Sequence, residues 1–248
     1  TNPGWIPNGR YRTTDHRNLG VLDTTGVITK SSNIGTSKIV QRLDDRYYHD
    51  YVARLGFGRS TGSGFPGEAS GLLPPVDAWS GTTKQTMSYG YGLSATPLQI
   101  ARAYAAIANR GVAVQPTLVK GQQGKAEQVL DPAVADTVLK MMQTVTEPGG
   151  TAIQAAITGY HVAGKTGTAR KASGGGYSRR YVSFFAGVVP VENPRFSMVV
   201  VIDDPDPAKG IYGGAVAGPV FQKVMDGALR LMDVPPDDIE TWLAEQAR

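Results

Sequence analysis

The sequence predicts an α+β fold in which helices cover an antiparallel sheet. Helical patterns dominate residues 23–147, whereas three strand patterns follow one another between residues 161 and 204. The joints between these strands have hairpin length, which favours antiparallel pairing because parallel strands need a long crossover connection. The third strand pattern, residues 195–204, is apolar at nearly every position, so both faces of the sheet are expected to be covered.

Five helical patterns with clear boundaries occur between residues 23 and 147. Residues 1–22 show no periodicity and are expected to be irregular. An aspartate opens a helix over residues 23–30, and apolar spacing resumes over residues 34–43 after an SSN interruption. Paired acids open a third helix over residues 44–55, which stops at a glycine. Two further helices begin on a Thr-Pro pair at residues 96–97 and an Asp-Pro pair at residues 131–132.

The rest of the chain is predicted as a long irregular segment, a sheet and a closing helix. Residues 56–90 are rich in Gly and Pro and carry little periodicity. Strand patterns follow at residues 161–169, 181–191 and 195–204. A closing helix is expected over residues 213–232 despite Pro219. We therefore expect a helical part at about 23–147 and a sheet with a C-terminal helix at about 158–232.

The composition restricts the chemistry available to this chain. Of its 248 residues, 41% are hydrophobic and 19% charged, with 25 Lys and Arg against 21 Asp and Glu, which excludes a disordered chain and gives nucleic-acid binding little support. There is no cysteine, and His16, His49 and His161 lie far apart. The absence of cysteine excludes disulfides and thiol catalysis, and the three separated histidines disfavour a histidine-based metal site. We expect no metal and no cofactor, and catalysis through Ser, Thr, Lys or carboxylates.

Lys165-Thr166-Gly167-Thr168 lies on the first predicted strand and suits the recognition of a peptide carboxylate. The lysine supplies a positive field, and the two threonines supply hydrogen-bond donors. Gly167 would let an extended substrate backbone lie against an edge strand and share its hydrogen bonds.

The segment Ser31-Ser32-Asn33 interrupts a helical stretch and allows two interpretations. A serine and an amide two residues apart in a loop can relay a proton and hold a substrate carbonyl. The alternative is a plain cap between two helices, since a Ser-x-Asn triplet is expected about once by chance in a chain of this length.

Together and in this order, the two motifs resemble those of serine acyl-transferases that react with β-lactams, whose signature is S-x-x-K, S-D-N and K-T-G. The segments KSSNIGTSKI, SYGYGLSATPLQIARAYAAIANRG, AGKTGTAR and FFAGVVP are similar to the transpeptidase domain of class B penicillin-binding proteins. The resemblance is strongest to the cell-division type, the penicillin-binding protein 3 family. SSN in place of SDN favours this group over class A β-lactamases. The resemblance implies a penicillin-binding protein/β-lactamase-like fold and a peptidoglycan D,D-transpeptidase that cross-links septal wall.

The sequence departs from this family in one respect. It contains no Ser-x-x-K, and its Thr-x-x-K matches, ending at Lys120, Lys140 and Lys171, follow SSN and so have the wrong order. In the family the nucleophile precedes the SxN loop by several dozen residues, and only thirty residues precede it here. The resemblance therefore implies that residues 1–248 are a partial transpeptidase domain, without the nucleophilic serine, the membrane anchor or the pedestal. We expect this fragment itself to be inactive.

The resemblance also implies a role for each matching residue. Ser31 would relay protons to the leaving group, and Asn33 would hold the peptide carbonyl and the absent lysine. Lys165 would supply positive potential beside Ser31. Thr166 and Thr168 would bind the substrate carboxylate, and the backbone N–H of Thr168 would form half of the oxyanion hole.

Four more residues join this expected site. Arg170 would add affinity for the carboxylate. Tyr91, Tyr181 and Tyr212 occupy places where relatives have aromatic walls around the bound acyl group. Ordinary packing is the alternative explanation for these three tyrosines.

The resemblance extends to ligands, partners and location. It implies stem peptides ending in D-Ala-D-Ala and β-lactams as ligands, other division proteins of the septal wall-synthesis complex as partners, and a role in cell-wall biogenesis and cell shape. The parent would be anchored in the bacterial inner membrane with its catalytic domain in the periplasm, whereas the fragment, whose longest apolar stretch is residues 196–202, is expected to be soluble. A non-catalytic ligand-binding lobe and a serine β-lactamase-like hydrolase stay open as alternatives.

Overall fold

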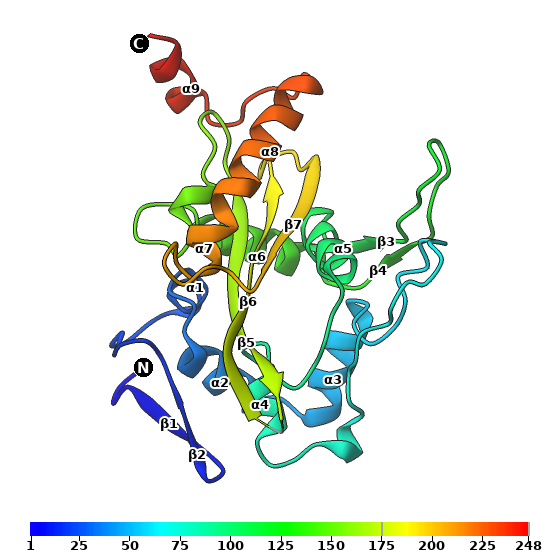
Figure 1. Ribbon diagram of the computed structural model, residues 1–248. Coiled ribbons are helices and arrows are strands. Elements are labelled where there is room, and N and C mark those ends of the chain that lie inside the picture. Colours follow the sequence, from blue (N-terminus) through cyan, green and yellow to red (C-terminus); the bar gives the residue numbers. More distant parts are fainter. Residues whose placement is uncertain (175, 248) are drawn as a thin grey trace.

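A three-stranded antiparallel sheet lies at the centre of the computed structural model, which describes residues 1–174 and 176–247. Its strands are β5 (Ala163–Ser173), β6 (Gly176–Val189) and β7 (Phe196–Asp203), in the spatial order β5-β6-β7. This order places β5, which carries the KTGT motif, at an edge of the sheet (Figure 1). The predictions of an α+β fold and an antiparallel sheet are both confirmed.

Helix α8 (Gly218–Leu231) covers one face of the sheet through an aromatic contact. Phe185 of β6 and Phe221 of α8 are fully buried, with their rings edge to face at 4.9 Å. The predicted closing helix is in fact two helices, since α7 (Gly213–Val216) ends before α8 begins. Pro219 explains the break, because proline lacks an N–H and fits only the first turn of a new helix.

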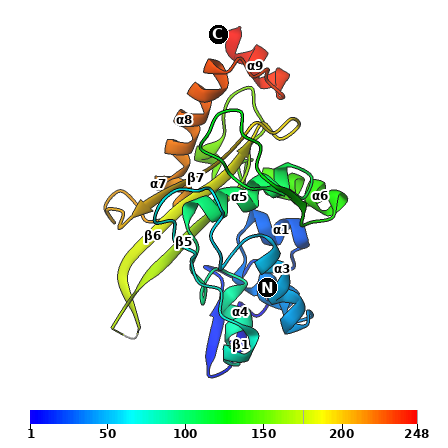
Figure 2. The same cartoon turned by 90° about the vertical axis from the view of Figure 1, so that its right-hand side faces the viewer.

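Helices α5 (Pro97–Ala108) and α6 (Pro132–Gln143) cover the opposite face, as Figure 2 shows. Leu139 and Met142 of α6 pack in one cluster with Ala163, Val188 and Val191. Both helices begin on the predicted caps, and in α5 Thr96 forms a capping box with Gln99. The hairpin of β3 (Val112–Val114) and β4 (Ala126–Gln128) connects α5 to α6.

The N-terminal region contains a hairpin that the sequence analysis did not predict. Strands β1 (Trp5–Asn8) and β2 (Tyr11–Thr14) pair in antiparallel register around a two-residue turn. Gly9 adopts a φ of +58° in that turn, a value that favours glycine. The next helices follow the prediction closely: α1 (Thr24–Thr29), α2 (Asn33–Val40) and α3 (Asp45–Arg54).

The segment after α3 is largely irregular, as predicted, but holds two short helices. These are the 3₁₀ turn η1 (Val76–Ala78) and α4 (Thr83–Met87). A second 3₁₀ turn, η2 (Ile153–Ala155), precedes the sheet, and α9 (Ile239–Gln246) ends the described chain. Within residues 1–174 and 176–247, no helix is both long enough and apolar enough to cross a bilayer.

Candidate active site

The middle residue of SSN is a helix cap, which matches the alternative interpretation of this motif. Ser32 is 1% exposed, and its Oγ accepts a hydrogen bond from the N–H of Gly35 at 2.9 Å, which caps α2. The same hydroxyl donates to Oδ2 of Asp15 at 2.6 Å, while Oδ1 of Asp15 accepts from the N–H of Ile34 at 3.1 Å. Because Ser32 caps the helix, the outer residues of the triplet need not do so.

Ser31 stands in the loop between α1 and α2 and contacts the KTGT motif directly. Its φ of +55° is uncommon for a residue other than glycine. Lys165 Nζ donates to Ser31 Oγ at 2.6 Å, joining two motifs that are 134 positions apart in the sequence. The same ammonium donates to the C=O of Thr166 at 3.2 Å.

Lys165 is the titratable group of this site with a strongly shifted pKa. Desolvation lowers its pKa from the ordinary value of 10.5 to about 8. The ammonium is therefore mostly charged near pH 7, although it holds its proton less firmly than a surface lysine. A charged, poorly hydrated ammonium is a strong receptor for a carboxylate, because an anion replaces the water that the cation has lost.

The two threonines of KTGT face the other side of β5, because side chains alternate along a strand. Thr166 Oγ1 lies 3.1 Å from Thr151 Oγ1. Thr168 Oγ1 accepts a hydrogen bond from the N–H of Gly213, at the start of α7, at 3.1 Å. Functional groups thus reach the free edge of β5 from both faces of the sheet.

Gly167 is required by packing inside the sheet. Gly167 lies opposite Phe184 of β6, and a Cβ atom added at Gly167 would stand 2.1 Å from the Phe184 ring. We expected this glycine to admit a substrate backbone, but the space that a side chain would need is filled by Phe184 instead.

Asn33 does not join the cluster around Lys165. Its Nδ2 donates to the C=O of Thr14 in β2 at 3.1 Å, so the side chain ties α2 to the N-terminal hairpin. Nδ2 carries two hydrogens, so Asn33 can keep this hydrogen bond and still donate the second hydrogen to a substrate carbonyl.

Arg170 and Tyr91 meet through the backbone of β5. The N–H of Arg170 donates to the hydroxyl of Tyr91 at 3.2 Å, and the Tyr91 ring lies edge to face against Tyr177 at 5.2 Å. Tyr181 lies opposite Arg170 in the register of β5 and β6. Tyr212 is 54% exposed, next to Gly213, with its ring edge to face against His16 at 5.4 Å.

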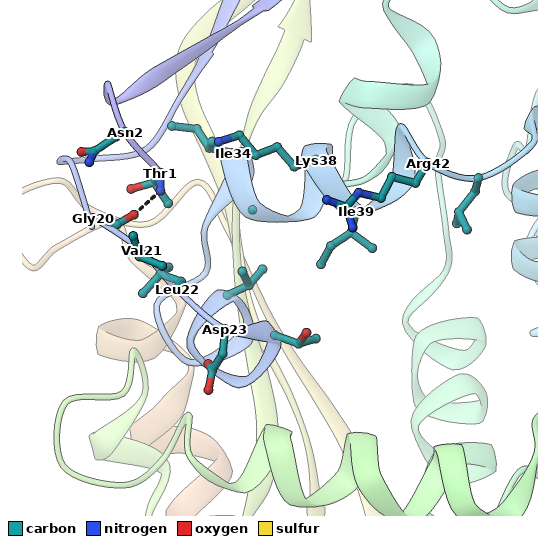
Figure 3. A pocket seen from close by; sticks show the side chains of 14 residues that line it. Thr1, Asn2, Gly20, Val21, Leu22, Asp23, Ile34, Lys38, Ile39 and Arg42 are labelled. Atoms are coloured by element: carbon teal, nitrogen blue, oxygen red, sulfur yellow. Dashed lines mark hydrogen bonds between the residues drawn. The ribbon is translucent and has the colours of Figure 1, made fainter.

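A large cavity lies beside this cluster and contains none of the predicted site residues. It has a volume of about 590 Å³ and lies between α1, α2 and the N-terminal segment (Figure 3). Its walls include Val21, Leu22, Ile34 and Ile39, and Lys38 and Arg42 also line it. The candidate site is thus the open edge of β5, and this cavity is separate from its residues.

The sequence analysis missed Asp15, Thr151, Gly213 and Tyr177 as partners of the site residues. A signal existed for Asp15, because an Asn-Gly pair at residues 8–9 is a hairpin signal that would have placed β2 just before Asp15. No local signal identifies the other three partners, because each contact depends on which elements pack together.

The comparisons with known proteins agree with the fold and the motifs. Residues 1–226 match the family model of the penicillin binding protein transpeptidase domain. The chain belongs to this family. This match, together with the relatives described next, confirms the predicted resemblance to class B penicillin-binding proteins of the penicillin-binding protein 3 type.

Two curated relatives and one solved structure illustrate the match. The peptidoglycan D,D-transpeptidase FtsI of Escherichia coli K12 is 44% identical over 222 residues, covering 89% of this chain and 38% of the relative. FtsI of Buchnera aphidicola is 39% identical over 237 residues, covering 95% of this chain and 42% of the relative. The apo transpeptidase domain of penicillin-binding protein 3 from Burkholderia pseudomallei has a TM-score of 0.88 and 39% identity, covering 94% of this chain and 72% of that one. The chain thus spans about two fifths of the length of these curated relatives.

Proposed function

We propose that this chain is part of a peptidoglycan D,D-transpeptidase that cross-links stem peptides during septal wall synthesis and is a target of β-lactams. The hydrogen bond of 2.6 Å between Lys165 and Ser31 is the observation that carries the proposal. Two motifs that are individually weak in the sequence meet at one strand edge, which supports a site where a positive charge and a proton relay act on the same substrate.

In this proposal, each residue acts on a peptide lying along β5. Lys165 attracts the terminal carboxylate, and Thr166 and Thr168 donate hydrogen bonds to it. The N–H of Thr168 stabilises the oxyanion of the tetrahedral intermediate. Ser31, whose Oγ accepts a hydrogen bond from Lys165 Nζ, relays a proton to the departing D-Ala.

The remaining predicted residues act around that centre. Arg170 adds positive charge for the carboxylate, and Gly167 keeps the strand packed on Phe184 so that the edge stays in place. Asn33 holds the substrate carbonyl with the second hydrogen of its Nδ2 while keeping its bond to Thr14. Tyr91, Tyr181 and Tyr212 border the acyl group.

The proposed nucleophile is the serine of a Ser-x-x-K segment that these 248 residues do not contain. Its hydroxyl would attack the carbonyl of the penultimate D-Ala, and the C–N bond to the terminal D-Ala would break. An amine of a stem peptide on a neighbouring peptidoglycan strand would then attack the acyl-enzyme, take the acyl group and release the serine. Residues 1–248 would accordingly be a partial transpeptidase domain, with a helical part at about 23–147 and a sheet part at about 158–232.

The proposal extends to location and partners. Septal cross-linking takes place outside the inner membrane, so the parent protein would be anchored there with this domain in the periplasm. It would act with other proteins of the division complex. The names of the curated FtsI relatives support this assignment.

A fluorescent penicillin tests the proposal. We expect no covalent labelling of the 248-residue chain and stable labelling of a longer version that includes the Ser-x-x-K segment, read on a denaturing gel and as a mass increase. The control is the longer version with the serine of that segment replaced by alanine, which should stay unlabelled.

Each other outcome supports a different function or a different nucleophile for this protein. Labelling of the short chain would mean that its nucleophile lies within residues 1–248. Rapid turnover of penicillin by the longer version would indicate a serine β-lactamase-like hydrolase. Failure of the longer version to form any adduct would indicate a non-catalytic ligand-binding lobe.

A further inference from the structure

The free edge of β5 presents its backbone groups in alternation, and two backbone hydrogen bonds identify which residues point outward. The N–H of Arg170 leaves the sheet to reach Tyr91, and the C=O of its cross-strand partner Tyr181 accepts from the N–H of Asp204 on the β7 side. Arg170 and Tyr181 therefore form a non-hydrogen-bonded pair. By the period of two along an antiparallel strand, Thr166, Thr168 and Arg170 all point their N–H and C=O groups to the free edge.

Two of these three positions already have partners. The C=O of Thr166 accepts from Lys165 Nζ at 3.2 Å, and the N–H of Arg170 donates to the Tyr91 hydroxyl at 3.2 Å. Within the described residues, neither the N–H nor the C=O of Thr168 bonds to a side chain or a loop. Of these three residues, Thr168 thus has both outward backbone groups available, whereas the C=O of Thr166 and the N–H of Arg170 are already bonded.

Tyr91 is held in this position by aromatic neighbours and by the shape of the strand. Its ring contacts Tyr89 at 6.1 Å and Tyr177 at 5.2 Å, both in edge-to-face or near edge-to-face geometry. The register of β5 and β6 shifts between Arg170 and Ala172, so the regular edge also ends there. The bulge and the tyrosine mark the same limit.

We propose that Tyr91 sets the length of peptide that can pair with β5, restricting the backbone pairing of an acyl donor to a single residue at Thr168. This inference rests on the proposed function. A donor that adds antiparallel to β5 places its acyl residue opposite Thr168 and the residue two positions earlier opposite Arg170. The Tyr91 hydroxyl holds the Arg170 N–H that this earlier residue would need. Tyr91 is therefore a specificity-determining residue: the enzyme binds the backbone of the D-Ala end of the donor and does not pair with the donor backbone that precedes it.

Tyr91→Phe tests the contact in the 248-residue chain without any need for catalysis. The variant keeps the ring and its packing but loses the hydroxyl. In the wild type we expect the amide proton of Arg170 to exchange with solvent more slowly than that of Thr168, measured by NMR. In the variant the two rates should become similar. An Arg170 amide that stays protected in Tyr91→Phe would overturn the inference.

The functional arm uses the longer protein that carries the Ser-x-x-K segment. Two donor peptides ending in D-Ala-D-Ala are compared, with one or with three residues before the acyl D-Ala, and kcat/KM for acylation is measured for both. The ratio of long to short donor should rise about fivefold in Tyr91→Phe, the effect of one added hydrogen bond. Tyr177→Phe is the matched control, because it removes a hydroxyl from the adjacent ring, and its ratio should match the wild type.

The outcomes separate this inference from the proposed function. If wild-type protein is acylated and the ratio does not change in Tyr91→Phe, the length limit is wrong and the proposed function stands. If the ratio rises equally in Tyr177→Phe, the effect comes from the packing of the aromatic group, and the role of the Tyr91 hydroxyl is wrong. If the wild type forms no acyl-enzyme with either donor, the proposed function itself fails.

Discussion

The desolvated charge of Lys165, which we propose binds the substrate carboxylate, lowers the stability of the fold. Its pKa of about 8, against 10.5 ordinarily, means that protonation costs more in the folded chain than in the unfolded one. Lys165→Met should therefore raise the free energy of unfolding at pH 7 by about 1 kcal/mol, measured with a denaturant. Ser31 is exposed, so water can replace its lost partner. Lys223→Met, at an exposed position of α8, should change stability by less than about 0.5 kcal/mol.

The pH dependence of this difference follows from the direction of the pKa shift. Between pH 8 and about pH 10 the unfolded chain binds more protons at this lysine than the folded chain does, so wild-type stability rises with pH. The penalty is complete below pH 8 and fades above it. The advantage of Lys165→Met should accordingly shrink toward pH 10, and a constant advantage would contradict a desolvated ammonium.

Helix α2 depends on Ser32, the middle residue of SSN, whose hydroxyl caps the helix. Ser32→Ala removes the cap and leaves Oδ2 of Asp15 without the hydroxyl that donates to it. We expect a loss of about 1–2 kcal/mol in the free energy of unfolding, since both a cap and a charge-assisted hydrogen bond disappear. Ser94→Ala is the control, because Ser94 is exposed and, among residues 1–174 and 176–247, forms hydrogen bonds only through its backbone. Equal effects of the two substitutions would contradict the role of the cap.

Elements with strong end signals could be predicted from the sequence, and elements defined by tertiary contacts could not. Asp23, Asp44, Thr96 and Asp131 each accept backbone N–H groups at the expected helix starts. The β1–β2 hairpin has strands of only four residues with little apolar alternation, and its Thr13 and Asn8 contact Tyr89 from a distant segment. Such short strands depend on these neighbours, so periodicity alone did not identify them.

The site follows the same division on the scale of the whole molecule. The identities of Ser31, Lys165 and Thr168 could be inferred from short motifs, because their chemistry is a property of the side chains. The functions of Gly167 and Tyr91 depend on strand register and on which segments reach the sheet edge, as their contacts with Phe184 and Arg170 show. Register is a tertiary property, so a single sequence constrained it only weakly.

The sheet and α8 should unfold together, because they share one buried apolar cluster that includes the Phe185–Phe221 pair. Phe221→Ala removes a side chain that is 0% exposed and packs on Phe185, and we expect the free energy of unfolding to fall by about 3–5 kcal/mol. Val224→Ala, at a position of α8 that is 49% exposed, should cost less than about 1 kcal/mol. Because α7 and α8 are separated only by Ala217, loosening α8 should also release the Gly213 N–H from Thr168. Faster exchange of the Gly213 amide in Phe221→Ala, but not in Val224→Ala, would show that core packing affects the geometry of the site. Similar losses of stability in the two variants would contradict the importance of the Phe185–Phe221 contact.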